Sequence, residues 1–197
     1  MTDWLESAII AHSELESPAS FWKWSLLCAI SAILKDNVWL DKFRYKLYPN
    51  VYVMLHADSG LKKGPPINLA SRLVNAVNNT NVIEGRSSIQ GIMKDMSSAK
   101  TLPGGKIQHS NNVFLCWSEL TSSIVSDPVA MDILTDLYDR HYRGEKYRSL
   151  LKQEVFDIKT PVITMLSGSN EAHTNDFFGQ KDLQGGFFAR TFIIYES

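Results

Sequence analysis

The residues with the clearest chemical potential lie at positions 57–64, between a run of apolar residues and a helical pattern. A phosphate-binding loop needs small residues that let backbone N–H groups converge on phosphate oxygens, a lysine for the terminal phosphates and a helix N-terminus behind it. Against the pattern G-x-x-x-x-G-K-S/T, Lys63 is in register and Gly60 lies in the middle. The segment therefore predicts a nucleotide-phosphate loop. Its residues are Ala57, Asp58, Ser59, Gly60, Leu61, Lys62, Lys63 and Gly64.

The loop departs from that pattern at three positions. Ala57 and Lys62 stand where glycines are usual, and Gly64 replaces the hydroxyl residue that would bind magnesium. Gly64 still lets the backbone approach a phosphate closely, and Lys62 adds a second positive charge. The departures leave a second interpretation open, in which the segment is a polar strand-to-helix turn with solvated lysines.

A second polar pair follows the apolar run 113–117. A nucleotide hydrolase uses an acidic residue at the end of a core strand to hold magnesium and orient water. Glu119 is the predicted catalytic base. Ser118 stands where a magnesium-binding aspartate is usual, so it would hold the metal only through a water molecule. The alternative role for Glu119 is that of a helix-start residue.

Asn170 and Arg190 complete the predicted catalytic set. Asn170 follows the apolar run 161–166, and its side-chain amide could orient the attacking water. Arg190 precedes the last apolar run, where it could reach a γ-phosphate in its own or a neighbouring subunit. The structural alternatives are a capping role for Asn170 and a strand-start role for Arg190.

The segment 138–148 alternates aromatic and basic residues. This pattern is typical of single-stranded nucleic-acid binding, because bases stack on aromatic rings while cations contact phosphates. A solvated loop or hairpin with internal ion pairs is the alternative. The predicted contact residues are Arg140, Tyr142, Arg143, Lys146 and Arg148.

The elements that must position these residues alternate along the chain. Apolar runs predict strands at 38–48, 51–55, 82–83, 113–117, 161–166 and 191–195. Helical spacing predicts helices at 4–15, 18–34 with Ser17 as N-cap, 64–77, 89–98, 120–125 and 130–138, and 102–112 is expected to be a surface loop. Strands separated by helices imply a parallel α/β sheet whose ligand site lies at the carboxyl ends of the strands.

Composition limits the class of protein. The chain has 197 residues, 44% of them hydrophobic and 21% charged, and a formal net charge of -1, which suits one globular domain and restricts any nucleic-acid contact to a local patch. Cys28 and Cys116 lie in apolar runs, so a disulfide is not expected. The opening residues lack the features of a signal peptide, and the stretch 25–34 is too short to span a bilayer. We expect a cytoplasmic protein without a membrane partner.

Several segments together resemble a family of P-loop ATPases of phages and mobile elements that often accompany a primase and are regarded as helicase-like. The segments that carry the resemblance are ESPASFWKWSLLCAISAIL, YPNVYVMLHADSGLKKG, VFLCWSEL, LTDLYD, PVITMLSGSN and GGFFART. The resemblance implies that 57–64 bind ATP phosphates, that Ser118 and Glu119 form the Walker B pair, that Asn170 is sensor-like and that Arg190 is an arginine finger. It covers residues 17–195, and members usually continue beyond the final strand, so it implies a missing C-terminal helical part.

The sequence thus predicts an α/β P-loop NTPase with a mainly parallel five-stranded sheet, RecA- or AAA-like, with a helical lead-in and strand at 1–48 and the core at 49–197. The expected activity is an ATP- and Mg²⁺-dependent helicase or translocase acting on single-stranded DNA as a homo-oligomer in a bacterial host cytoplasm, beside a primase or other replication protein. The first alternative is a degenerate nucleotide-binding or assembly module. The second is a small-molecule kinase, against which Pro65 and the absence of an arginine-rich lid argue.

Overall fold

A central sheet of five parallel strands organises the molecule. The computed structural model describes residues 3–77, 80–85, 87–101, 107–109, 111–120, 124, 127–140, 147–151, 154–170 and 186–197. The strands are β3 (Tyr52–Ala57), β4 (Asn81–Glu84), β7 (Asn112–Trp117), β10 (Val162–Ser169) and β11 (Thr191–Glu196), and their order in the sheet is β11-β3-β10-β7-β4. The predicted five-stranded α/β sheet is confirmed, and every pair in it is parallel.

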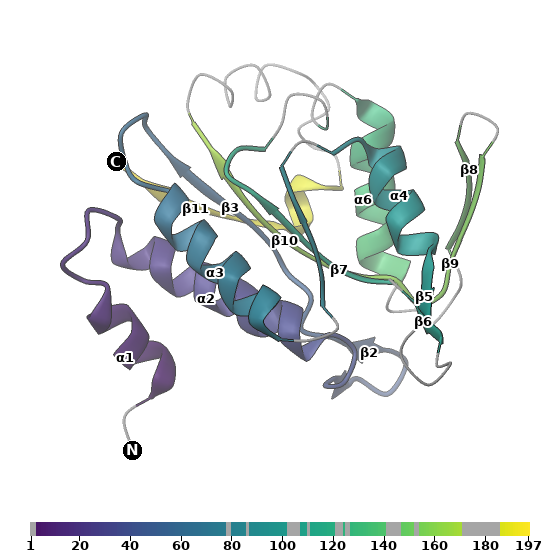
Figure 1. Ribbon diagram of the computed structural model, residues 1–197, viewed down its shortest axis with the longest axis horizontal. Coiled ribbons are helices and arrows are strands. Elements are labelled where there is room, and N and C mark those ends of the chain that lie inside the picture. The colour runs from purple at the N-terminus through teal and green to yellow at the C-terminus, as the bar shows by residue number, and fades with distance from the viewer. Residues whose placement is uncertain are drawn as a thin grey trace.

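Helices cover both faces of this sheet (Figure 1). One face carries α2 (Ala19–Leu34) and α3 (Gly64–Ala76), and the other carries α4 (Ile89–Ser97) and α6 (Pro128–Arg140). All eight residues of β10 are buried. Burial on both faces explains why the first residues of this strand do not alternate between apolar and charged side chains. The first helix, α1 (Trp4–Ala11), has no buried residue.

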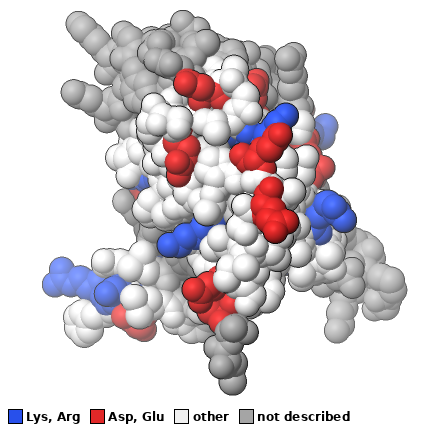
Figure 2. All heavy atoms as spheres, turned by 90° about the vertical axis from the view of Figure 1, so that its left-hand side faces the viewer, with Lys and Arg blue, Asp and Glu red and all other residues white. Residues whose placement is uncertain are grey.

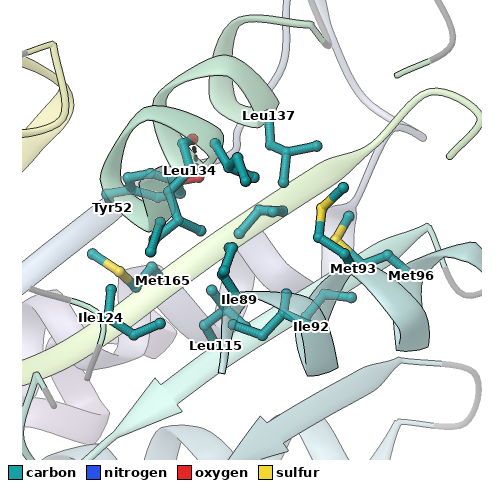
Figure 3. Packing of buried hydrophobic residues seen from close by; sticks show 14 of the residues in the cluster. Tyr52, Ile89, Ile92, Met93, Met96, Leu115, Ile124, Leu134, Leu137 and Met165 are labelled. Atoms are coloured by element: carbon teal, nitrogen blue, oxygen red, sulfur yellow. Dashed lines mark hydrogen bonds between the residues drawn. The ribbon is translucent and has the colours of Figure 1, made fainter. Parts of the chain in front are cut away.

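The face under α4 and α6 has a methionine-rich core (Figure 3). Met93 and Met96 of α4 pack with aliphatic side chains from the sheet and from α6. Tyr52 lies in the same cluster, and its hydroxyl donates a hydrogen bond of 2.9 Å to the Leu134 carbonyl. Burial raises the pKa of Tyr52 well above its ordinary value, so this hydroxyl remains a donor.

The chain reverses its direction across the sheet after β4. It passes from β3 to the edge strand β4, returns through β7 and β10, and finally places β11 on the other side of β3. The helices change face at the reversal, as right-handed crossovers require. The carboxyl ends of β3, β10 and β7 are consequently neighbours, and ligands of such sheets bind outside these ends.

In the part of the chain that the structure describes, three short antiparallel strand pairs flank the sheet. They pair β1 (Leu40–Asp41) with β2 (Lys46–Leu47), β5 (Ala99–Thr101) with β6 (Ile107–His109), and β8 (Tyr147–Leu151) with β9 (Glu154–Ile158). The prediction of one strand at 38–48 is wrong, because a turn at 42–45 folds it back on itself. The prediction of a loop throughout 102–112 is also wrong where β6 and the start of β7 occupy it.

The N-terminal region differs from its prediction in two places. Helix α1 ends at Ala11 and not at the predicted residue 15, since the His12 N–H donates to the Ile9 and Ile10 carbonyls in a tighter turn. Pro18, not Ser17, is the N-cap of α2, and the Ser17 hydroxyl instead bonds to the Lys62 carbonyl. Among the described residues, no helix has the length and apolar character needed to cross a bilayer.

Candidate functional site

The loop 57–64 joins the buried strand β3 to the N-terminus of α3. Gly60 lies in its middle with φ +117°, a conformation that side chains rarely adopt, so this position requires glycine. The helix starts at Gly64, and its first turn contains prolines that cost no hydrogen bond, because first-turn N–H groups have no partner inside a helix.

The side chain of Lys63, the residue just before α3, turns inward to the start of this loop. It is 9% exposed, and its Nζ donates to the Ala57 carbonyl at 2.8 Å and to the Asp58 carbonyl at 3.2 Å. Burial lowers the pKa of Lys63, and the carboxylates of Glu119 and Asp58 oppose that shift. The loop therefore folds around the Lys63 ammonium group at the start of α3, and the backbone carbonyls of the loop are the hydrogen-bond partners of that group.

The turn that carries Ser118 and Glu119 is fixed to β10. The Leu120 N–H donates to the Gly168 carbonyl at 2.7 Å. A Cβ at Gly168 would lie 2.2 Å from the Ser118 carbonyl oxygen, so only glycine permits this approach. Gly168 is not among the residues predicted for the site, although a glycine inside a buried strand is a known signal of close backbone approach.

The structure brings three of the predicted catalytic residues to one end of the sheet. Register pairs Ser169 of β10 with His56 of β3, and Ser167 with Trp117 of β7. Asn170, which directly follows β10, is therefore placed between the start of the loop 57–64 and the turn at Ser118. Ser118 and Glu119 are exposed and Asn170 is partly buried. The influence of Glu119 on the pKa of Lys63 agrees with this convergence.

The N-terminal lead-in holds the loop from outside. The Ser17 hydroxyl donates to the Lys62 carbonyl at 2.5 Å, across 45 positions of sequence. The Ser17 carbonyl in turn accepts a hydrogen bond of 3.2 Å from the Trp22 indole. The ion pair between Lys62 and Glu16 is 3.7 Å long and exposed, so it contributes little. The loop's backbone is therefore bonded to Ser17, just before α2, while the Lys62 side chain faces solvent.

Buried polar atoms lie beneath this end of the sheet. Ser167 and Ser169 are 0% and 2% exposed, and neither hydroxyl has a hydrogen-bond partner in the part of the chain that the structure describes. The same holds for the indole N–H of Trp117, which pairs in register with Ser167. Such groups cost free energy in a folded protein, so this end of the sheet is not optimised for stability alone.

Arg190 lies at the opposite end of the sheet. Its neighbour Thr191 pairs with Tyr52 at the amino end of β3, about 17 Å along the strand from Ala57 at about 3.3 Å per residue. The guanidinium bonds to both carboxylate oxygens of Asp139 in α6, and its Nη1 donates to the Gly186 carbonyl at 2.6 Å. This position excludes contact with a phosphate at 57–64 of the same chain. A role across a subunit interface stays a prediction.

The predicted nucleic-acid residues are only partly described. Arg140 ends α6, and Arg148 is an exposed residue of β8. Tyr142, Arg143 and Lys146 lie outside the described residues. Charged side chains on the face shown in Figure 2 are scattered, and neither sign forms a continuous patch there. A nucleic-acid role for 138–148 stays a prediction.

The residues at the carboxyl end suit a phosphate group better than a free metal ion. Among the described residues, no group of three or more His, Cys, Asp or Glu side chains could hold a metal. Magnesium in nucleotide sites is nevertheless bound through one or two carboxylates and the phosphates themselves, and Asp58 and Glu119 are exposed carboxylates at this end. At Gly64, no described atom lies within 4 Å of a Cβ position, so a hydroxyl side chain would fit.

The fold and the site together define an α/β protein with a lysine-centred loop at the carboxyl edge of a parallel sheet. In comparisons with known proteins, no family model matches the sequence and no curated protein is significantly similar.

Proposed function

We propose that this chain is a P-loop ATPase domain that binds ATP at the loop 57–64 and acts as a helicase-like or translocase-like motor on single-stranded DNA, as a homo-oligomer with a replication partner. The observation that supports ATP binding best is the inward-turned Lys63, which donates to the Ala57 and Asp58 carbonyls at the start of α3. An ammonium group held by its own loop is placed to exchange neutral acceptors for phosphate oxygens, which form stronger hydrogen bonds.

In the proposed reaction, the chain's own groups divide the work. Lys63 and the N–H groups at the start of α3 hold the terminal phosphates. Glu119 accepts a proton from the attacking water, and Asn170 orients that water from the end of β10. Asp58, Ser118 and Glu119 would hold Mg²⁺, which when bound neutralises charge on the phosphates.

The test is binding of a fluorescent ATP analogue with and without Mg²⁺. Lys63→Ala should weaken binding more than about tenfold, because a hydrogen bond to a charged group contributes about 1.5–3 kcal/mol. Lys94→Ala is the matched control, since Lys94 is an exposed residue of α4 outside the loop, and it should change binding about twofold or less. Equal affinities for the wild type and Lys63→Ala would contradict the proposal, provided that circular dichroism shows both proteins folded.

The open space at Gly64 supports a second candidate, a nucleotide-binding module that does not turn over. Here the missing hydroxyl would limit magnesium binding. Wild type that binds ATP without hydrolysis, together with measurable hydrolysis by Gly64→Thr, would favour this candidate. Hydrolysis by the wild type that Glu119→Gln abolishes at unchanged ATP affinity would favour the motor.

A further inference from the structure

The hairpin formed by residues 38–48 presents an unusual set of exposed side chains. Trp39 is 47% exposed, Tyr45 49% and Phe43, at the tip, 96%. Lys42, Arg44 and Lys46 alternate with these aromatic residues and are all exposed. With Asp41 as its only carboxylate, the hairpin carries an excess of two positive charges on a chain whose formal net charge is -1. Aromatic rings and cations are thus concentrated on one projection.

The Phe43 side chain does not hold the turn at the hairpin tip. Phe43 has φ 65°, a region in which a bulky residue is a clear outlier, and its ring is almost fully solvated. The turn itself is held by other groups: the Lys42 N–H donates to the Tyr45 carbonyl, and the Asp41 carboxylate accepts from the Phe43 N–H. Glycine or asparagine would serve this backbone better, so the Phe43 side chain is retained at a cost.

The base of the hairpin is firmly anchored. The Ser31 hydroxyl of α2 donates to the Pro49 carbonyl at 2.6 Å and bonds to Thr164 of β10. The Lys46 Nζ lies 4.1 Å from the centre of the Trp39 ring. The Trp39 ring also packs against the Tyr48 ring, with 6.3 Å between the two centroids. The strands next to the exposed rings are consequently bound to each other, and their base is bonded to α2. Figure 1 shows β2 at the end of the sheet opposite the C-terminus.

We propose that this hairpin is a binding site for single-stranded DNA, with bases stacked on Phe43 and Tyr45 and with phosphates held by Lys42 and Arg44. Aromatic platforms interleaved with cations are the chemistry that binds single strands without sequence preference. A membrane anchor would separate its apolar face from its charged face, whereas here Phe43 is flanked on both sides by cations. The preference for DNA over RNA rests on the proposed function. The site itself does not depend on ATP binding.

The test is fluorescence anisotropy of a labelled oligothymidylate, measured without nucleotide across a salt series. Phe43→Gly should weaken binding about tenfold at an unchanged salt slope, because stacking is lost while the charges remain. Lys42→Gln with Arg44→Gln should reduce the slope by roughly 1.4, at about 0.7 per phosphate contact on a single strand. Trp4→Ala and Lys23→Gln are matched controls, exposed but outside the hairpin, and should leave binding unchanged.

Three results would overturn the proposal: wild-type affinity in both hairpin variants, tighter binding of the matched oligouridylate, or hairpin-dependent binding to phosphatidylserine vesicles without DNA binding. Phe43→Asn keeps the tip conformation and separates loss of the ring from any change of the turn. Because no nucleotide is present, loss of DNA binding in these variants is distinguishable from loss of ATP binding in Lys63→Ala. A protein that binds ATP but no DNA refutes this proposal and the DNA-motor part of the proposed function, and leaves ATP binding at 57–64 standing. DNA binding that the hairpin variants do not weaken refutes this proposal alone.

Discussion

The two ends of the central sheet are built in different ways. At the carboxyl end, contacts between distant segments fix the polar groups, as in the bonds from Leu120 to Gly168 and from Ser17 to Lys62. At the amino end, bonds between near neighbours form the tip of the 38–48 hairpin. In the loop 57–64 the residue with positive φ is a glycine, Gly60, whereas in the hairpin it is a phenylalanine, Phe43.

This difference indicates where a substitution is a clean probe. A change at Gly168 or Ser17 disturbs packing and chemistry together, because each of these residues contacts a segment distant in sequence. A change at the hairpin tip should alter binding without altering stability.

Gly168→Ala should destabilise the protein most, by about 3 kcal/mol, because the new Cβ would meet the Ser118 carbonyl and displace the turn that carries Glu119. Gly64→Ala is the matched control. It meets no described atom within 4 Å and should change the free energy of unfolding by less than about 1 kcal/mol. Urea unfolding followed by circular dichroism measures both. Similar values for the two variants would show that the turn does not depend on close approach to β10.

Ser31→Ala should destabilise the fold by about 1–3 kcal/mol, since it leaves the Pro49 carbonyl and the Thr164 hydroxyl without their buried partner. Ser167→Ala should be neutral or stabilising by about 1 kcal/mol, because it removes a buried hydroxyl that has no described partner. Comparison of the two unfolding midpoints at equal m-value measures the difference. A destabilising Ser167→Ala would mean that this hydroxyl does pair in solution.

Asp139→Asn should cost about 1 kcal/mol of stability, because the ion pair with Arg190 is partly exposed, at 27% and 41% of the two side chains. Its affinity for ATP should equal that of the wild type, since the pair lies at the far end of the sheet from Lys63. Arg190→Ala adds a test of the predicted role between subunits. Lost hydrolysis at unchanged ATP affinity would support that role, and weakened ATP binding would contradict the geometry described here.

The smallest effect is expected at the hairpin tip. Phe43→Gly should leave the free energy of unfolding unchanged or raise it by about 0.5–1 kcal/mol, because glycine adopts positive φ without strain. Gly60→Ala, the converse change in the loop at φ +117°, should lower stability by about 1 kcal/mol and weaken ATP binding. Thermal unfolding of the two variants in parallel measures the contrast. Marked destabilisation by Phe43→Gly would mean that the ring packs in solution.

Much of the fold could be predicted because the sheet strands are continuous apolar runs. The strands at 51–55, 113–117 and 161–166 were each placed within a few residues, as were α3 and α4. The sequence pattern at 38–48 predicts a single strand where the structure has a hairpin, because alternation of apolar and charged residues has the same period in one strand and in two. Its turn contains neither glycine nor proline to mark it.

The sequence by itself determined the α/β class, the order along the chain of the central-sheet strands, and the candidate residues Lys63, Glu119 and Asn170, since these depend on local periodicity and on which residue follows each apolar run. Only the tertiary structure decided that β10 lies between β3 and β7, that Gly168 must be glycine, and that Arg190 pairs with Asp139 away from the loop. Strand order and close approach arise from packing between segments distant in sequence. No local pattern encodes that packing.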